Sequence, residues 1–215
     1  MEIDHVFIFT GVKARAGDAL VDFGLREGSG NSHPGQGTAN RRFFFHNFML
    51  ELLWIENMEE ATNEKTAPLQ FDERFLRKSE KTSPFGLIFR PAGEADTEPP
   101  FPSWAYKSDY LPEGLQLWVA KDTALSEPLY FYFPFADRAN CPEPPAHDVH
   151  LKAVTAVAVR LHQSGELSQA AKIINLTDAV KILAGCENVL EIEFDHGVQG
   201  NRKDFRPELP LVFRW

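Results

Sequence analysis

The sequence has few cysteines, only Cys141 and Cys186 among 215 residues. Two cysteines cannot form a disulfide framework, and neither lies in a C-x-x-C pair or a recognisable nucleophile motif. No signal-peptide pattern is present, because a predicted strand follows Met1 almost at once. We therefore expect free thiols and a cytoplasmic, reducing location.

The sequence also lacks an excess of positive charge, since 22 Lys and Arg stand against 31 Asp and Glu. A nucleic-acid-binding protein usually carries a basic face, so no nucleic-acid partner is expected. No apolar run approaches the ~20 residues of a membrane-spanning helix, so no membrane is expected either. By contrast, phenylalanine is abundant, at 18 residues. This abundance predicts an aromatic interior or an apolar pocket.

Several motifs of enzyme chemistry are missing as well. There is no G-x-S-x-G sequence and no Ser-His-Asp signature. The glycines of residues 27–38 do not form G-x-G-x-x-G, and a hairpin follows them instead of a helix. Glycine still permits close approach of the backbone to a ligand. With Arg41 and Arg42 just beyond, the segment is either an anion site or a bent edge of a sheet.

The strongest pattern present lies at residues 38–56, where two apolar runs flank His46-Asn47. Asn tolerates the left-handed backbone of tight turns, so we predict a β-hairpin that places Arg42 opposite Glu51. Strand side chains alternate between faces. One face would then be purely apolar, and the other would carry Asn40, Arg42, Phe44, Met49, Glu51 and Leu53.

Glu51 is the one carboxylate in this long apolar stretch, and burying it is costly unless it is paired or bound. Two explanations follow from the residues alone. Arg42 can form a cross-strand ion pair with Glu51. Alternatively, Glu51 binds a metal ion or a ligand.

The rest of the chain reads as alternating strands and short helices. Residues 3–10 form a strong strand pattern, and residues 58–82 form a charged helix or loop. Further strands are predicted at 85–90, 115–120, 129–135, 153–161, 188–194 and 209–215. Residues 167–183 have helical spacing with a break near Asn175. The loop 91–112 holds Trp104, Tyr106 and Tyr110, as a lid over a cleft or as a small satellite core.

Three segments together resemble the glyoxalase-like branch of the vicinal-oxygen-chelate superfamily. They are I-D-H-V at residues 3–6, H-P-G-Q-G-T-A-N at residues 33–40 and L-E-L at residues 50–52. Proteins of this group build paired βαβββ modules whose curved mixed sheets enclose a ligand cleft. The resemblance therefore implies an α+β fold with helices on the outer face of the sheets.

The same resemblance divides the chain into modules. A first module would span residues 1–57 and a looser second module residues 83–135, within a unit of residues 1–138. A Pro-rich linker at 139–147 would follow. Residues 147–215 would then form a C-terminal β-α-β-β module that packs on the first two.

In the metal-dependent members, a His on the first strand and a Glu on the last strand of a module bind one divalent metal. His5 and Glu51 match this pair, so the resemblance implies metal binding by both, with Glu51 as the catalytic residue. Zn, Fe, Ni or Mn would suit these ligands. His5 alone can equally be a hydrogen-bonded core residue.

Two further ligands come from the partner module in those proteins, and they are not visible here. The strand S-P-F-G-L-I-F-R-P has no His, and E-P-L-Y-F-Y-F-P-F has no carboxylate in its apolar run. His147, His150 or Glu191 could complete the site, the last because Leu190-Glu191-Ile192 resembles Leu50-Glu51-Leu52. A second chain in a homodimer could also supply ligands.

Two function hypotheses therefore stay open. One is a metal-dependent lyase, isomerase or dioxygenase. The other is a metal-free protein that binds a small anionic or oxygen-rich molecule, with Glu51 paired to Arg42. In both, the ligand would contact Arg41, Arg42, His33 and Asn40. The sequence decides neither the substrate nor the oligomeric state.

Overall fold

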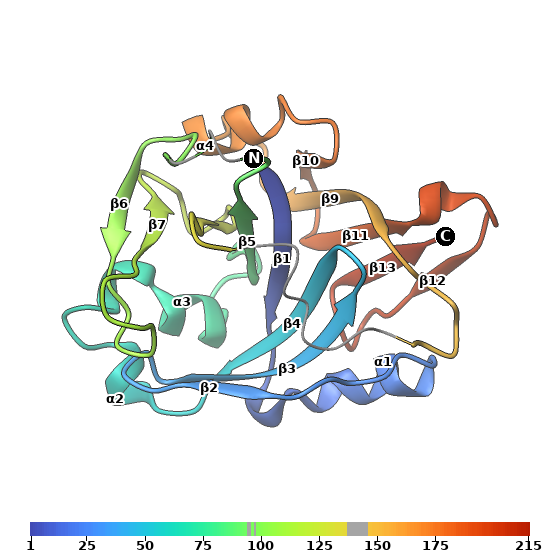
Figure 1. Ribbon diagram of the computed structural model, residues 1–215, viewed down its shortest axis with the longest axis horizontal. Helices are drawn as coiled ribbons and strands as arrows, with labels where there is room; N and C mark the ends of the chain where they lie inside the picture. The colour runs from blue at the N-terminus through green and yellow to red at the C-terminus, as the bar shows by residue number, and fades with distance from the viewer. Residues whose placement is uncertain (94–95, 97, 137–145) are drawn as a thin grey trace.

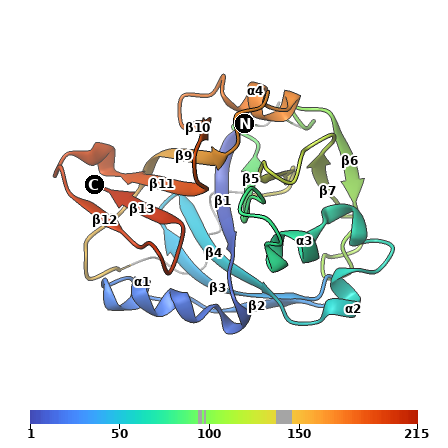
Figure 2. The same ribbon diagram turned by 180° about the vertical axis from the view of Figure 1, so that it is seen from behind.

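Two mixed β-sheets and a few short helices make up the computed structural model, which describes residues 1–93, 96, 98–136 and 146–215. Cys141 and most of the predicted linker lie outside the described residues. Figure 1 shows the C-terminal strands on one side of β1, with β6, β7 and α3 on the other. The same arrangement is seen from behind in Figure 2.

The N-terminal half of the first sheet is one βαβββ module. Its strands are β1 (Glu2–Phe9), β2 (Asn31–His33), β3 (Thr38–Phe45) and β4 (Phe48–Ile55). The 3-10 helix η1 (Val12–Gly17) and helix α1 (Asp18–Asp22) follow β1. Strand β4 pairs parallel to β1 and antiparallel to β3, and β2 pairs antiparallel to β3. These four strands are neighbours in one sheet, in the order β2-β3-β4-β1.

The second half of this sheet repeats the strand order and pairing, with no helix among the described residues between its first two strands. It consists of β5 (Phe85–Arg90), β6 (Ser103–Tyr106), β7 (Leu117–Ala120) and β8 (Leu129–Tyr132). β5 pairs parallel to β8 and antiparallel to β1, so the two halves join into one eight-stranded sheet. Helix α2 (Met58–Ala61), the 3-10 helix η2 (Ala67–Leu69) and helix α3 (Phe71–Leu76) connect them. Strand β6 was not predicted, because Pro and Gly residues surround its four residues.

The predicted hairpin register is confirmed. Arg42 lies opposite Glu51 and Asn40 opposite Leu53, across a turn at His46-Asn47. The apolar face, with Phe43 among its residues, is buried in the main core. The other face, which carries Glu51, is therefore free to line a cavity.

The C-terminal elements form the five-stranded second sheet and the short helices that connect its strands. These are β9 (Val154–His162), α4 (Gln169–Ile174), β10 (Val180–Gly185), β11 (Val189–Phe194), η4 (Asp195–Gly197), β12 (Arg202–Asp204) and β13 (Leu211–Arg214). Its order β10-β9-β11-β13-β12 repeats the order β4-β1-β5-β8-β7 of the first sheet. The parallel and antiparallel pairings also agree at every step.

The predicted break near Asn175 coincides with the end of α4, but the helical spacing expected beyond it is wrong, because those residues form β10. The Asn175 side chain accepts a hydrogen bond from the Ile182 backbone N–H at 2.7 Å and donates to the Ile182 carbonyl at 3.0 Å. These two bonds pair the backbone N–H and carbonyl of Ile182, as a neighbouring strand would. They end α4 and start β10.

The main core lies between the two sheets. It combines Val6 and Ile8 of β1 with Val159 of β9 and Ile192 of β11, and helices α1 and α4 contribute to it through Leu20 and Ile174. A second core covers the opposite face of the first sheet and includes Phe71 of α3. Among the described residues, no helix is long and apolar enough to cross a membrane.

Candidate functional site

A cavity of about 170 Å³ opens on the face of the first sheet that points away from the second sheet. The first module contributes both polar and apolar side chains to its lining, the apolar ones being Phe7, Met49 and Leu53. The polar side chains all come from the first module, namely His5, Asn31, His33, Gln36, Asn40, Arg42 and Glu51. The second module and its loop add apolar and aromatic groups, namely Ile88, Tyr110, Leu117, Phe131 and Phe133. One end of the cavity is therefore polar and the other apolar.

Glu51 lies on β4 at the polar end and is only 5% exposed. Its Oε1 atom accepts a hydrogen bond from Asn40 Nδ2 at 2.5 Å, and Asn40 Oδ1 accepts from the Asn31 backbone N–H at 2.7 Å. Asn40 is thus fixed by the edge strand β2 and holds the carboxylate in one orientation. Oε2 remains directed toward His5.

His5 lies on β1 and is 8% exposed. Its Nδ1 atom is 2.6 Å from Asp4 Oδ1, and the other Asp4 oxygen accepts from Arg90 Nη1 at 2.6 Å. Burial by itself raises the pKa of Asp4. The hydrogen bond and charge of His5, together with Arg90, outweigh burial and hold that pKa below its usual value.

This arrangement fixes the chemistry that His5 presents to the cavity. Because Nδ1 contacts Asp4, Nε2 is the ring nitrogen that faces the cavity. Nε2 lies 3.9 Å from Glu51 Oε2. An imidazole nitrogen and a carboxylate oxygen on adjacent parallel strands therefore face each other without a direct hydrogen bond between them.

His33, Gln36 and Tyr110 close the cavity from the side. His33 Nδ1 lies 2.8 Å from Thr38 Oγ1, and the His33 ring contacts Tyr110 with centroids 4.7 Å apart. Burial lowers the pKa of His33, with Glu51 opposing the shift, so this ring is neutral near pH 7. Burial also raises the pKa of Tyr110. Neither group adds a charge to the site at neutral pH.

Tyr106 and Tyr110 show that the loop regions contribute to both the core and the cavity. Tyr106 is 3% exposed, belongs to the second core and donates to Gln36 Oε1 at 3.2 Å. Tyr110 lines the cavity. The satellite-core interpretation of this aromatic loop therefore applies to Tyr106. The interpretation in which the loop covers a cleft applies to Tyr110.

The two arginines that were predicted to bind substrate behave differently. Arg41 points to the opposite face of β3, where its guanidinium donates to Glu27, Asp18 and the Ala14 carbonyl. The structure therefore does not bring Arg41 to the cavity. Alternation along the strand already separates it from Arg42.

Arg42 does line the cavity, but it does not pair with Glu51. Its guanidinium donates to the Ser29 carbonyl at 2.6 Å and to Ser29 Oγ at 2.7 Å, and it lies over the Phe44 ring. Within the described residues, no ion pair joins Arg42 to Glu51. The expectation that this pair explains the buried carboxylate is wrong.

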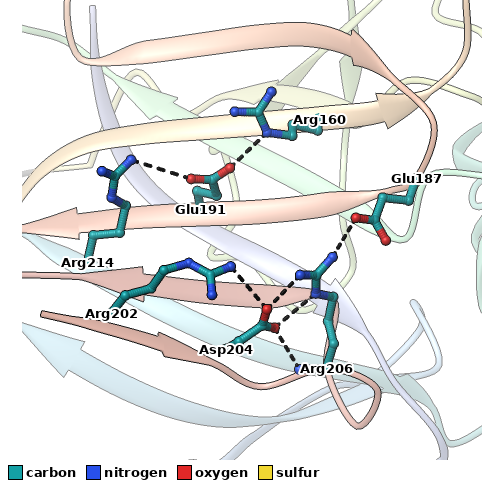
Figure 3. Close-up of polar contacts among 7 residues, drawn as sticks. All are labelled: Arg160, Glu187, Glu191, Arg202, Asp204, Arg206 and Arg214. Carbon is teal, nitrogen blue, oxygen red and sulfur yellow. Dashed lines mark hydrogen bonds and ion pairs between the residues drawn. The ribbon is translucent and has the colours of Figure 1, made fainter.

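The residues that might have completed a metal site lie elsewhere. His147 accepts from the Arg26 N–H through Nδ1, and its Nε2 lies 2.8 Å from the Phe44 carbonyl, so both nitrogens have structural partners. Glu191 lies on the second sheet between Arg160, at 2.8 Å, and Arg214, at 3.9 Å (Figure 3). His150 follows His147 in a turn and does not line the cavity.

The donor set does not fit the four-ligand metal site implied by the resemblance. His5 and Glu51 are present at the expected positions, but Ile88 and Phe131 occupy the facing strands β5 and β8. Among the described residues, no group of three or more His, Cys, Asp or Glu side chains is placed to hold a metal. We therefore derive no chemical step through a metal.

Sequence reasoning missed several residues of the site. Asp4 and Arg90, which orient His5, were not singled out, although Asp4 is adjacent to His5 and charged at a strand position. Gln36 and Phe71 also line the cavity. Phe71 follows a left-handed residue, Gln70, at the start of α3, and no sequence pattern directs its ring toward β1.

An eight-stranded sheet of two joined βαβββ-type halves, with a His and a Glu on the adjacent strands β1 and β4, defines a glyoxalase-like architecture. A family model described as a glyoxalase-like domain matches residues 3–162, and the chain belongs to this family. No curated protein matches the sequence.

Solved structures support the fold. A hypothetical protein from Staphylococcus aureus is 11% identical, with a TM-score of 0.56, and the match covers 99% of this chain and 98% of that one. A hypothetical protein from Bacillus halodurans is 13% identical with a TM-score of 0.39, covering 63% of this chain and 95% of that one. Only the first likeness bears on the fold, and neither protein has an assigned function in its description.

Proposed function

We propose that this glyoxalase-like protein binds a small organic molecule in the cavity, with the polar end at Glu51 and His5 and the apolar body against the second module. The observation that carries the proposal is the mixed lining, in which polar side chains of the first module lie beside apolar and aromatic side chains, most of them from the second module and the segment before it. Such a pocket is typical of small-molecule sites, where few polar groups orient a mainly apolar ligand.

The hydrogen bonding of Glu51 supports binding by side chains, without a four-ligand metal centre. The carboxylate of Glu51 is almost fully buried, yet its single hydrogen bond within the described residues comes from Asn40. A buried carboxylate normally has more partners. A bound ligand would supply the missing donors.

A divalent-metal-dependent enzyme is the second candidate, favoured by one observation. Asp4 orients His5 through Nδ1, as carboxylates commonly orient metal-binding histidines. This candidate requires ligands beyond His5 and Glu51, from a second chain or from substrate. Elemental analysis of protein purified without an affinity tag separates the two, since the first proposal predicts no stoichiometric metal.

Methionine methyl groups offer a sharp test of the first proposal. The chain has three Met residues, of which Met49 lines the cavity and Met58 is 41% exposed elsewhere. In protein with labelled methionine methyl groups, a ligand in the cavity should shift the Met49 signal and leave Met58 unchanged. If no compound of a broad panel of small amphipathic molecules shifts Met49, the proposal fails.

A further inference from the structure

We infer that two copies of this protein pair through the edge strand β6 and join their first sheets across a two-fold axis. β6 is the last strand of the first sheet and lies on the side of the molecule opposite β12 (Figure 1). The inference goes beyond the proposed function and does not depend on what the cavity binds. It starts from the backbone groups that β6 directs away from the sheet.

The register of β6 shows which of its backbone groups face outward. β6 pairs antiparallel with β7, and the Lys121 N–H donates to the Pro102 carbonyl at 2.9 Å. Because inward and outward groups alternate along a strand, the N–H and carbonyl groups of Ser103 and Ala105 point away from β7. Within the described residues, no backbone hydrogen bond occupies these groups from the outer side. The edge therefore offers two donors and two acceptors to a partner strand.

The edges of the second sheet are protected, whereas β6 is not. β12 has the charged sequence Arg-Lys-Asp, and at β10 the side chain of Asn175 occupies the N–H and carbonyl of Ile182. Charged or covered edges keep proteins from pairing strand to strand. β6 has the uncharged sequence Ser-Trp-Ala-Tyr, and Ala105 is exposed. This edge is therefore open to strand addition.

The pattern of outward groups is complementary to itself, which points to a second copy as the partner. The two outward residues are two positions apart, so a two-fold axis at Trp104 places Ser103 of each copy opposite Ala105 of the other. Each such pair exchanges two hydrogen bonds, so the two pairs make four in all. Every outward donor and acceptor of Ser103 and Ala105 is then used.

The same register brings the two Trp104 side chains together. They are directly opposite in a pair without backbone hydrogen bonds, where cross-strand side chains come closest. Trp104 is partly buried against the second core and lines a groove of about 610 Å³ with Pro68, Leu111 and Leu115. Pairing covers the exposed part of the indole with another aromatic ring, which is a favourable cross-strand contact.

The charges beside β6 also allow two copies to approach each other here. The groove carries Lys65 and Lys107 together with Glu64, Asp109 and Glu113, so both signs are mixed along the edge. The whole chain has a net charge of −9, which makes two copies repel each other over longer distances. Salt screens this repulsion. We therefore expect dimerisation to be at least as tight at 300 mM NaCl as at 50 mM.

Sedimentation velocity over a range of protein concentrations tests the inference. The apparent mass of wild-type protein should rise with concentration from 24.3 kDa toward twice that value. Ala105→Pro removes an outward N–H that makes no bond to β7, and the two-fold axis applies the loss twice. The dissociation constant of the dimer should therefore rise at least about tenfold. Circular dichroism checks that the variant is folded.

The other edge of the same sheet provides the matched control. Gly28 N–H donates to the Arg42 carbonyl, and Asn31 lies opposite Asn40, so the outward residue of β2 is Ser32. Ser32→Pro removes an outward N–H there as Ala105→Pro does on β6. It should leave the dissociation constant of the dimer unchanged.

Cross-linking tests the register without a proline substitution. In protein with Cys141→Ser and Cys186→Ser, Trp104→Cys should form a disulfide-linked dimer when oxidised glutathione is added. Directly opposite residues without backbone hydrogen bonds have Cα atoms about 4.5 Å apart, which a disulfide can span. Ala105→Cys in the same background should give much less linked dimer, because Ala105 lies opposite Ser103 instead of its own copy.

Several outcomes would overturn the inference. One is wild-type protein that stays monomeric at concentrations up to about 1 mM. Another is a dimer that Ala105→Pro leaves unchanged, which would place the contact on a different surface. If Ser32→Pro weakens association as much as Ala105→Pro, β2 pairs with β6 in an open chain and the two-fold contact is wrong. If Ala105→Pro does not fold, the cross-link decides: preferential linkage through Trp104→Cys supports the inference, and equal or absent linkage overturns it.

Discussion

At the scale of single residues, the site depends on one buried carboxylate and on the neighbours that orient it. Alternation along the strands and a two-residue turn were enough to predict which side chains share a face with Glu51. The partners of Glu51 could not be predicted, because Arg42 finds a closer acceptor in Ser29, on a loop that returns past β3. The Asp4–His5 contact depends on Arg90, which a distant segment brings to β1.

Glu51→Gln should change the free energy of unfolding by less than about 1 kcal/mol. Among the described residues no Lys or Arg pairs with Glu51, and the glutamine retains the Asn40 hydrogen bond, so little is lost and a desolvated charge is removed. Urea denaturation measures the change. A loss of about 3 kcal/mol or more would indicate the buried ion pair that the structure lacks.

The pH dependence of stability should reflect Asp4. The folded-state pKa of Asp4 is lowered, so its contribution is present above the unfolded-state value of about 3.9 and is lost as pH falls through the folded-state value. Wild type should therefore lose stability below about pH 4 more steeply than Asp4→Asn.

Denaturation of both proteins at a series of pH values checks this. Asp4→Asn also leaves Arg90 without one partner, so we expect it to be about 3 kcal/mol less stable at pH 7. Equal pH slopes for the two proteins would contradict the role of Asp4.

At the scale of elements, strands were easier to predict than their neighbours. β1, β3 and β4 have strong apolar patterns, whereas β6 and β12 are short edge strands without one. The break predicted near Asn175 is the end of α4, but the helical spacing continued into residues that form β10, because the side-chain bonds of Asn175 to Ile182 are not periodic. A periodic sequence pattern therefore does not predict the end of an element where one side chain replaces a backbone hydrogen-bond partner.

The contact between β1 and β5 gives a prediction of its own. A Cβ atom at Gly86 would lie 2.1 Å from the ring of Phe7, which lines the cavity. Gly86→Ala should therefore push the ring aside and cost about 1–3 kcal/mol. Gly165→Ala, where a Cβ meets nothing within 4 Å, is the matched control.

Thermal or urea denaturation of these variants gives the comparison. Adding Phe7→Leu to Gly86→Ala should recover part of the loss, because leucine leaves room for the new methyl group. If the single Gly86→Ala variant is as stable as the control, the close packing of Phe7 on β5 is contradicted.

At the scale of the whole molecule, the C-terminal elements form a second sheet that repeats the central strand order of the first. The sequence suggested a repeated unit, but its apolar pattern did not reveal that the two sheets share one core. The turn of the hairpin also reaches the second sheet, since Asn47 exchanges two hydrogen bonds of 2.8 Å with the backbone of Val154.

This shared core predicts that the two sheets unfold together. We expect a single transition in calorimetry, with equal calorimetric and van't Hoff enthalpies, because separating the sheets would expose the apolar faces of both. Two resolved transitions would mean that the second sheet is an independent domain.

Ligand binding in the presence of a chelator shows whether the side chains of this chain make the site by themselves. A small amphipathic compound that shifts the Met49 methyl signal is added to labelled wild-type protein in excess EDTA, and that signal is followed. If the side chains are sufficient, the shift of Met49 is the same with and without EDTA. If EDTA abolishes the shift and one divalent metal restores it, a metal ion is required and the proposal of direct side-chain binding is contradicted.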